Sequence, residues 1–283
     1  MMTNKIVMVT GANSGIGRVT ARELAKKGAT VIMVCRNQLK GQAVQEDINA
    51  EIGGDRVHLL LADFSSHDSI RQMTDQFKSK FERLDVLVNN AGIMVKEKMM
   101  TDDGFEYMMG TNHFGYFLNT HYLLDVLKES NHARIVNVAS MAHRMATQDW
   151  ENMNGEKSFQ YFKQYGLTKL CNIQFSKQLS KYLEGTSITT NSLHPGIVNS
   201  NFGKGSYPSI VGAFADVFMV SPQKGAQTSI YLASSPEVKN INGAYFADSK
   251  RRFPSSLANN PNACEKLWNW SLEQTNIDTF GKL

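Results

Sequence analysis

Tyr165 and Lys169 stand four residues apart in the segment YGLTK. In a helix, this spacing places a phenol and an ammonium on the same face, one turn apart. A phenol with a pKa of about 10 is a poor acid or base at neutral pH, and a nearby cation lowers that pKa. The strand-like segment RIVNVAS ends at Ser140, whose hydroxyl can hydrogen-bond a substrate oxygen. The three residues together indicate acid–base chemistry on a carbonyl or alcohol, although a Tyr-x-x-x-Lys pair alone is more often surface decoration.

A glycine-rich turn, TGANSGIG at 10–17, follows the apolar run IVMV near the start of the chain. A turn between a first strand and a first helix presents backbone N–H groups that favour a phosphate or pyrophosphate. The spacing Gly-x-x-x-Gly-x-Gly differs from the common Gly-x-Gly-x-x-Gly fingerprint, and no Walker A lysine follows. A turn without any ligand is the alternative. The predicted binding residues are Gly11, Asn13, Ser14, Gly15, Ile16 and Gly17.

The end of the second expected strand, VIMVCRN, indicates which dinucleotide binds. NAD-preferring proteins place an acidic residue there for the ribose 2′-hydroxyl, whereas this chain has Cys35 followed by Arg36. A guanidinium suits a 2′-phosphate, so we expect NADP(H) rather than NAD. Arg18 either adds a second positive charge or lies on a solvated helix face. Asp63, after the third strand, either accepts a hydrogen bond from the adenine amine or caps the next helix.

Apolar, β-branched runs alternate with segments of helical period, which predicts a parallel sheet covered by helices on both faces. We therefore expect a single-domain α/β doubly wound Rossmann fold over 1–283, with a seven-stranded parallel sheet. The dinucleotide-binding part would cover about 1–140, and the catalytic and substrate-pocket part about 140–283. The expected strands are Lys5–Thr10, Thr30–Cys35, Val57–Ala62, Val86–Asn89, Ala133–Ala139, Ser187–Leu193 and Ala244–Phe246.

Composition excludes several classes of function. The formal net charge is only +4, and the cluster at 250–252 (KRR) is expected to be a solvated loop, so nucleic acid is a poor partner. Cys35, Cys171 and Cys264 have no metal-ligand spacing, and we expect no metal and a reducing compartment. Strand-like sequence begins by about Lys5, and no apolar stretch has the roughly 18 residues of a membrane span. A cytoplasmic protein without a transmembrane segment is expected.

The motifs together resemble the short-chain dehydrogenase/reductase superfamily. The similarity extends along essentially the whole chain, because the motifs occur in the order typical of that family. They are TGANSGIG, Asp63, NNAG at 89–92, Asn112 in GTNHFG, Ser140, YGLTK and HPGIV at 194–198.

The resemblance implies a catalytic tetrad of Asn112, Ser140, Tyr165 and Lys169. Tyr165 would exchange a proton with the substrate oxygen, and Ser140 would position that oxygen. Lys169 would lower the tyrosine pKa and hold the nicotinamide ribose. Asn112 would retain a water that links Lys169 to solvent; without the family context it would be an ordinary polar helix residue. His194 is expected to be structural.

The same resemblance implies further contacts with the cofactor. Asn90, Ala91 and Gly92 would close the fourth strand beside it, and residues after the sixth strand would hold the carboxamide. That second group consists of Pro195, Gly196, Val198 and Ser200.

Within the superfamily, the chain looks most like the retinol-dehydrogenase and WW-domain-oxidoreductase branch. The resembling segments include DGFEYMMGTNHFGYFL and RIVNVASMAHR. That branch implies NADP(H) and a lipophilic aldehyde, ketone or alcohol such as a retinoid. The expected substrate pocket includes Met141, Met145, Phe202 and Phe214. Family members often pair through the helix that carries the tyrosine, so a homodimer is possible.

Two other functions stay open from the sequence. One is a dinucleotide-binding sensor or scaffold that has lost catalysis, although such proteins commonly lose the tyrosine or the lysine. The other is a different reaction on the same scaffold, such as a protochlorophyllide-type reduction.

Overall fold

The computed structural model describes residues 2–196 and 220–282, and within them eight strands form one sheet. The strand order is β3-β2-β1-β4-β5-β6-β7-β8, in which β1 to β7 are parallel and β8 is antiparallel to β7. The doubly wound fold expected from the sequence is confirmed, with one strand more than the expected seven. The strands are Ile6–Thr10 (β1), Thr30–Cys35 (β2), Val57–Leu61 (β3), Val86–Asn89 (β4), Arg134–Val138 (β5), Thr189–His194 (β6), Tyr245–Ala247 (β7) and Lys250–Arg252 (β8).

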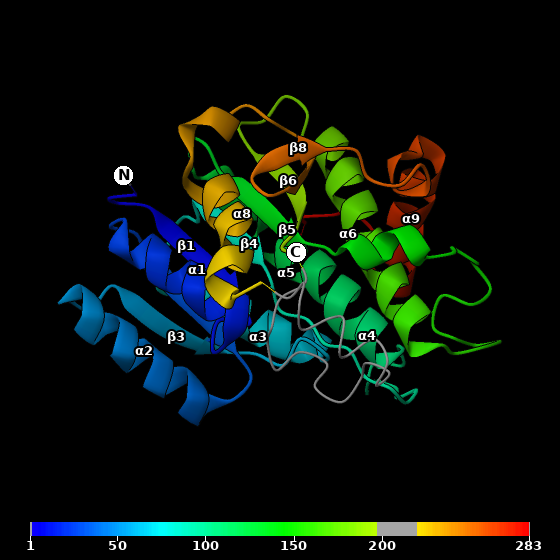
Figure 1. The fold of residues 1–283 in the computed structure, drawn as a ribbon, viewed down its shortest axis with the longest axis horizontal. Coiled ribbons are helices and arrows are strands. Elements are labelled where there is room, and N and C mark those ends of the chain that lie inside the picture. Colours follow the sequence, from blue (N-terminus) through cyan, green and yellow to red (C-terminus); the bar gives the residue numbers. More distant parts are fainter. Residues whose placement is uncertain (1, 197–219, 283) are drawn as a thin grey trace.

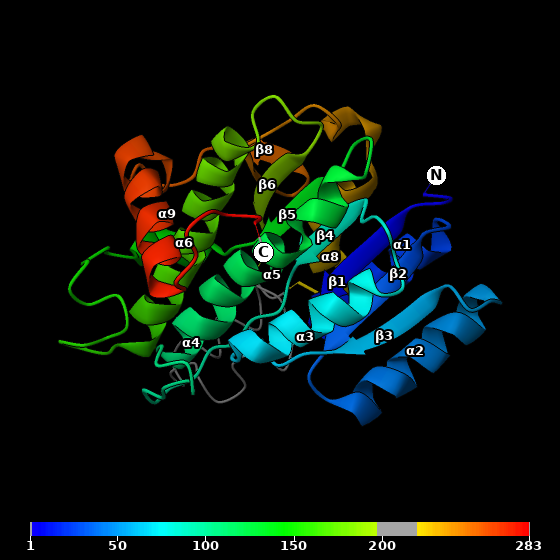
Figure 2. The ribbon, with the colours of Figure 1, turned by 180° about the vertical axis from the view of Figure 1, so that it is seen from behind.

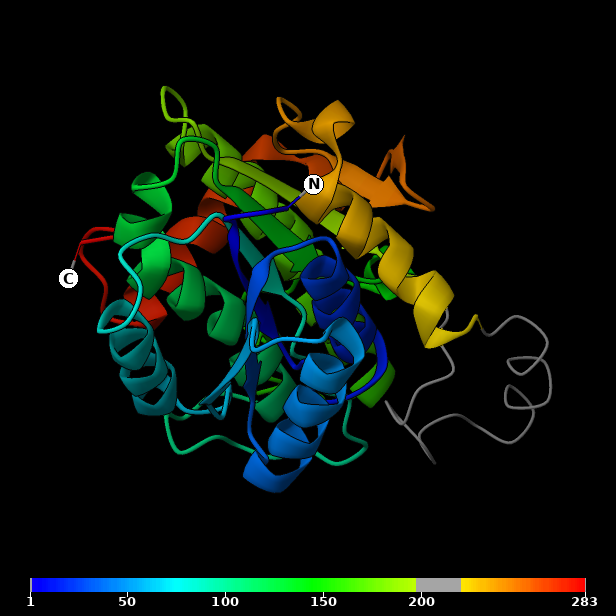
Figure 3. The ribbon, with the colours of Figure 1, turned by 90° about the vertical axis from the view of Figure 1, so that its left-hand side faces the viewer.

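Helices cover both faces of this sheet (Figures 1 and 2). α1, α2 and α8 lie on one face, and α3, α5 and α6 lie on the other, with α9 packed outside α6 (Figure 3). No helix within the described ranges is long and apolar enough to cross a membrane. The helices are Gly15–Lys26 (α1), Gln38–Ile52 (α2), His67–Lys78 (α3), Tyr107–Met109 (α4), Gly115–Lys128 (α5), Tyr161–Tyr182 (α6), Pro222–Ser234 (α8) and Pro261–Gln274 (α9).

The core consists of one apolar layer on each side of the sheet. Because successive side chains of a strand point to opposite faces, a continuous apolar strand serves both layers. In β1, Met8 packs with the α3, α5 and α6 layer, whereas Val7 and Val9 pack with the α1, α2 and α8 layer. This double burial explains why the strands read as unbroken apolar runs instead of alternating ones.

The eighth strand corrects the expectation of a solvated loop at 250–252. Lys250–Arg252 pairs with β7 across a two-residue turn, in which Asp248 and Ser249 both have positive φ, 51° and 56°. Such a turn matches the twist of a hairpin. All three strand residues are exposed, as is common for charged edge strands. Sequence periodicity missed the strand because none of its residues is buried.

The C-terminal segment lies over the two helices that follow β4 and β5. The side chain of Phe280 packs against Phe117 of α5 and Phe175 of α6. The Tyr182 hydroxyl donates to the Phe280 carbonyl at 2.7 Å, and the Gly281 N–H donates to His121 Nδ1 at 2.9 Å. A large part of this helical face is therefore covered by the chain's own end.

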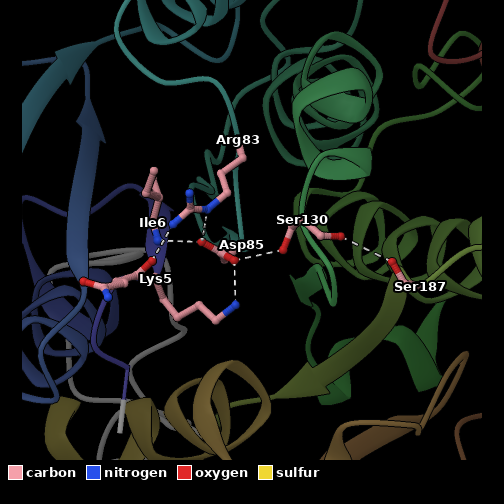
Figure 4. A network of polar contacts seen from close by, with 7 residues as sticks. Lys5, Ile6, Arg83, Asp85, Ser130 and Ser187 are labelled. Atoms are coloured by element: carbon pink, nitrogen blue, oxygen red, sulfur yellow. Dashed lines mark hydrogen bonds and ion pairs between the residues drawn. The ribbon is translucent and has the colours of Figure 1, made fainter.

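A buried carboxylate joins the amino ends of the central strands (Figure 4). Asp85, only 3% exposed, accepts hydrogen bonds from Lys5 Nζ at 2.7 Å, the Ile6 N–H at 2.9 Å and Ser130 Oγ at 2.9 Å. Arg83 Nε lies 3.4 Å away. Burial alone would raise the pKa of Asp85, but these donors together hold the pKa below its ordinary value. The carboxylate therefore stabilises the fold while it is ionised.

We expect Asp85→Asn to lower the free energy of unfolding at neutral pH by about 1–3 kcal/mol. The amide NH₂ of asparagine would replace one of the two oxygens that now accept hydrogen bonds, and would face a donor instead. The stabilisation by Asp85 exists above the unfolded pKa and disappears as the pH falls through the lower folded pKa. The difference between variant and parent should therefore shrink below about pH 4, as measured by urea unfolding. Asp55→Asn, at an exposed position, is the control. If Asp85→Asn lowered the free energy of unfolding equally at neutral pH and below about pH 4, this account would be contradicted.

Candidate active site

The glycine turn lies at the carboxyl end of β1, beside β4, where the strand order reverses. Gly11 and Gly15 have φ of 65° and 54°, in the left-handed region that favours glycine. A Cβ on Gly11 would lie 2.9 Å from the Cα of Ala91, and one on Gly17 would lie 2.2 Å from the carbonyl oxygen of Gly11. The turn therefore packs directly on the segment after β4, and only glycines fit there.

A cavity of about 310 Å³ opens beside this turn, at the edge where a doubly wound sheet binds its ligand. It joins the glycine turn to the ends of β2, β3 and β4. Its lining brings together the predicted residues Gly11, Asn13, Arg36, Asp63, Ala91 and Gly92, and adds Val34, Cys35, Asn37, Lys40, Ala62, Phe64, Ile93, Tyr107 and Thr111.

Thr10 fixes the position of the NNAG segment. Its hydroxyl oxygen accepts hydrogen bonds from the N–H groups of Asn90 and Ala91, each at 2.9 Å. Asn90 Nδ2 donates in turn to the Thr10 carbonyl at 2.8 Å. Thr10 was not among the predicted site residues, although it directly precedes Gly11 in the motif.

At the predicted adenine end of the cavity, Arg36 and Asp63 form an ion pair that the sequence did not predict. Arg36 Nη1 lies 3.3 Å from Asp63 Oδ2 and donates to the Tyr107 hydroxyl at 2.9 Å. Burial opposes ionisation of Asp63, but hydrogen bonds from Ser65 and the charge of Arg36 lower its pKa overall. Arg18 instead pairs with an exposed aspartate of α2, Asp47, at 3.1 Å and is absent from the cavity lining.

Asn112 lies in a π-helical turn, Gly110–Phe114, between α4 and α5. Its side-chain oxygen accepts from the Ile93 N–H at 2.8 Å, and its Nδ2 donates to the Ile93 carbonyl at 2.9 Å and to Thr168 Oγ1 at 3.1 Å. Single π-helical turns occur frequently at functional sites. This asparagine joins the segment after β4 to α6, which carries the tyrosine and lysine.

Lys169 is only 3% exposed, and its Nζ donates to the Val138 carbonyl at 3.1 Å. The nitrogen lies 5.5 Å from the centre of the Tyr116 ring and 5.7 Å from that of Tyr165. Burial lowers the pKa of Lys169 from 10.5 to about 7. A Cβ on Gly92 would lie 3.4 Å from this nitrogen, so the NNAG segment passes directly beside the amine.

Ser140 begins the 3₁₀ turn Met141–Met145, in which its Oγ accepts from the Ala142 N–H at 3.2 Å. Two histidines hold this turn. His143 Nδ1 lies 2.6 Å from the Ser140 carbonyl, while His143 Nε2 accepts from the Ser255 N–H at 3.1 Å. The proton of the neutral ring is therefore on Nδ1.

His194, at the end of β6, accepts from the Met141 N–H through Nδ1 at 3.1 Å. This contact agrees with the structural role predicted for His194. Burial lowers the pKa of both His143 and His194, that of His194 to about 4. Both rings therefore support the serine turn in their neutral form.

The start of α6 packs closely on the serine turn. A Cβ on Gly166 would lie 2.7 Å from the Ala142 carbonyl oxygen, so glycine lets the helix come this near. Tyr165 is half-buried beside it, on the same helix as Lys169. The tyrosine and Ser140 therefore lie on elements in direct contact, although 25 residues separate them in the sequence.

Several predicted residues can be placed only in part. Pro195 and Gly196 follow β6 directly, and Gly196 has a φ of 91°. Met141 and Met145 are half-exposed on the serine turn, 48% and 57%. Val198, Ser200, Phe202 and Phe214 lie outside the described residues.

We expect Lys169→Met to stabilise the protein without cofactor at pH values below about 7 by a few kcal/mol, on the order of the free energy that corresponds to the pKa shift. The folded state lowers the pKa of Lys169, so the charged amine opposes folding fully below the folded pKa and not at all above the unfolded pKa. The gain should thus disappear as the pH approaches about 10. Thermal unfolding across this range measures it. Lower stability of the variant near about pH 6 would contradict the assigned burial.

The chain matches the family model for short chain dehydrogenase over residues 5–209. Retinol dehydrogenase 12 of Mus musculus is 40% identical over 274 residues, covering 96% of this chain and 87% of that relative. Retinol dehydrogenase 14 of Homo sapiens is 40% identical over 289 residues, covering 96% and 86% respectively.

Solved structures agree with this assignment. An uncharacterized protein from Mycobacterium Paratuberculosis has a TM-score of 0.81 and 30% identity, covering 100% of this chain and 96% of that one. A Pseudomonas aeruginosa RhlG/NADP active-site complex has a TM-score of 0.71 and 26% identity, covering 87% and 94%. The chain therefore belongs to the short-chain dehydrogenase/reductase family of nicotinamide-dependent oxidoreductases, in its retinol dehydrogenase-like branch.

Proposed function

We propose that the protein is an NADP(H)-dependent oxidoreductase that transfers hydride between the nicotinamide and a lipophilic carbonyl or alcohol. One observation carries this proposal: the buried Lys169 amine lies 5.7 Å from the centre of the Tyr165 ring and directly beside Gly92, which lines the cavity next to the glycine turn. The cofactor supplies or accepts the hydride, and the protein supplies orientation and a proton.

The proton in this proposal moves through the hydroxyl of Tyr165. Ser140 Oγ holds the substrate oxygen, and the tyrosine donates its proton to that oxygen in reduction or removes it in oxidation. Positive charge on Lys169 favours the phenolate, and its pKa of about 7 lets the amine exchange a proton near neutral pH. Asn112 holds the segment after β4 beside the amine. A water retained by Asn112 completes the proposed proton path.

The glycine turn and the charge of the cavity lining support binding of a dinucleotide phosphate. Gly11 and Gly17 allow close backbone approach, and Asn13, Ser14, Gly15 and Ile16 are the proposed partners of the pyrophosphate. Arg36 and Lys40 are the cations of the lining, which favours the 2′-phosphate of NADP(H). Pro195, Gly196, Val198 and Ser200 are proposed to contact the nicotinamide carboxamide.

A lipophilic substrate is proposed from the half-exposed methionines beside Ser140 and from the named relatives. Met141 and Met145 offer adaptable apolar contact next to the reacting oxygen. Retinal or retinol is one candidate, because similar chains are named retinol dehydrogenases. Phe202 and Phe214 stay in the proposed pocket. Residues up to about 140 hold the dinucleotide and residues from about 140 to 283 supply the catalytic groups and the pocket in this proposal.

Cytoplasmic location and a possible homodimer also stay proposals. The C-terminal segment covers part of α6, which leaves less of that helix for a second copy. The alternative of a silent NADP-binding sensor has little support, because Ser140, Tyr165 and Lys169 are all present, and Lys169 lies beside Gly92 of the cavity lining. A protochlorophyllide-type reduction stays the other alternative; it would add the hydride and the proton across a carbon–carbon double bond instead of a carbonyl group.

Tyr165→Phe tests the chemistry directly. We expect the parent protein to oxidise NADPH with lipophilic aldehydes or ketones, including all-trans-retinal, and the variant to lose at least about 100-fold in kcat, because it lacks the acidic proton. Its affinity for NADP should stay within about 2-fold, measured by fluorescence titration, because the hydroxyl is one of many contacts. Parent activity that survives the substitution would contradict the role of the tyrosine. Tight NADP binding without turnover on any substrate would favour the sensor.

Arg36→Leu tests the cofactor preference. Loss of a charged hydrogen bond to phosphate should raise the KM for NADPH about 10- to 100-fold and leave the KM for NADH nearly unchanged. Steady-state kinetics with both cofactors measure this difference. Arg18→Leu is the matched control, because Arg18 pairs with Asp47 outside the cavity lining. An equal effect of Arg36→Leu on both cofactors would overturn the assignment of NADP.

A further inference from the structure

Glu106 is completely buried at the start of α4, outside the proposed tetrad. Its two carboxylate oxygens accept from the N–H groups of Met108 and Met109, each at 2.9 Å. A third donor comes from another part of the chain: Gln164 Nε2 lies 3.1 Å from Glu106 Oε2. Among the described residues no cation forms an ion pair with this carboxylate, so amide donors satisfy it.

Gln164 directly precedes Tyr165 in α6 and is only 5% exposed. The same Nε2 also donates to the Met153 carbonyl at 2.9 Å. The backbone N–H of Glu106 donates to Asn154 Oδ1 at 3.2 Å. Met153 and Asn154, in the long segment between Ser140 and Tyr165, are thus hydrogen-bonded to Gln164 and Glu106 respectively.

The elements on either side of this pair carry two of the proposed catalytic groups. α4 runs directly into the π-helical turn that contains Asn112, and Gln164 begins the helical turn that contains Tyr165. A buried carboxylate without its donors is strongly unfavourable, so the two elements keep one relative position as long as the hydrogen bond exists.

We infer that Glu106 and Gln164 are positioning residues, which fix Tyr165 relative to Asn112 through their buried hydrogen bond. The inference rests on the proposed function, because it assigns to these residues the alignment of that reaction. A purely structural helix cap is the competing explanation. The cap needs only the bonds to Met108 and Met109, whereas alignment needs the bond to Gln164.

Gln164→Met separates the two explanations, because it removes the donor and leaves the cap intact at nearly the same volume. We expect kcat for carbonyl reduction to fall about 10- to 100-fold, the effect of a small misplacement of a catalytic group. The KM for NADPH should stay within about 2-fold, because neither Glu106 nor Gln164 lines the cavity. Gln160→Met is the matched control: it makes the same change four residues earlier, at the exposed residue directly before α6, whose side chain forms no cap hydrogen bond.

A double-mutant cycle tests whether the two residues act together. Glu106→Met removes the acceptor at nearly the same volume. If the bond carries the effect, Gln164→Met should reduce kcat much less in the Glu106→Met background than in the parent. Equal fold-reductions in both backgrounds would mean independent structural defects and would overturn the inference. Unchanged kcat in Gln164→Met would overturn it as well, even if Glu106→Met fails to fold.

Hydrogen exchange separates this inference from the proposed function. In Gln164→Met, amides of 107–114 and of 161–168 should lose protection together, whereas Gln160→Met should leave 107–114 unchanged. A parent protein without turnover would refute the proposed function while this shared loss could still support the bond. Unchanged exchange in both segments would refute the bond as the link between them, whatever the parent's activity.

Discussion

The burial of the Lys169 amine against the Val138 carbonyl is the constraint on which the rest of the site depends. An amine removed from water is unfavourable in its charged form, and one carbonyl replaces little of the lost hydration. The amine is buried because α6 packs on β5 and on the serine turn, where Gly166 allows contact with the Ala142 carbonyl. Closer packing of α6 therefore does two things at once: it excludes water from the amine and brings Tyr165 towards Ser140.

The two ends of the sheet have separate roles. At the carboxyl ends, Thr10 ties β1 to the segment after β4, and glycines at 11 and 17 leave room for a ligand. At the amino ends, Asp85 accepts hydrogen bonds from Lys5, from Ile6 at the start of β1, and from Ser130 after α5. The hydrogen bonds of Asp85 thus stabilise the fold at the end of the sheet away from the cavity. The carboxyl ends of the strands keep small and polar residues that suit a ligand.

The sequence predicted those features whose signal is local. Seven strands were predicted, and the central strands β1, β2 and β4 were evident as apolar runs because they are buried on both faces. The glycine turn was evident from its position after β1. β8 was missed because all its side chains are exposed. Glu106 and the contact between Arg36 and Asp63 were missed for another reason: their partners are supplied by other elements, and no spacing within one segment reveals them. DGFEYMMG does contain a signal for Glu106, an acidic residue directly before a helical start.

The contact between Arg36 and Asp63 also changes the electrostatic argument about the cofactor. The segment at the end of β2 contains no carboxylate, yet Asp63, which follows β3, lies 3.3 Å from the guanidinium of Arg36. Arg36 alone would then offer little net charge to a 2′-phosphate, which carries about −1.5 to −2 at neutral pH. Lys40 lies in the same cavity lining, so two cations and one carboxylate leave one net positive charge. Asp63 and Tyr107 meanwhile hold the guanidinium in one orientation, which reduces the conformational entropy lost when a phosphate binds. The proposed preference for NADP(H) therefore rests on Arg36, Lys40, Asp63 and Tyr107 together and not on Arg36 by itself.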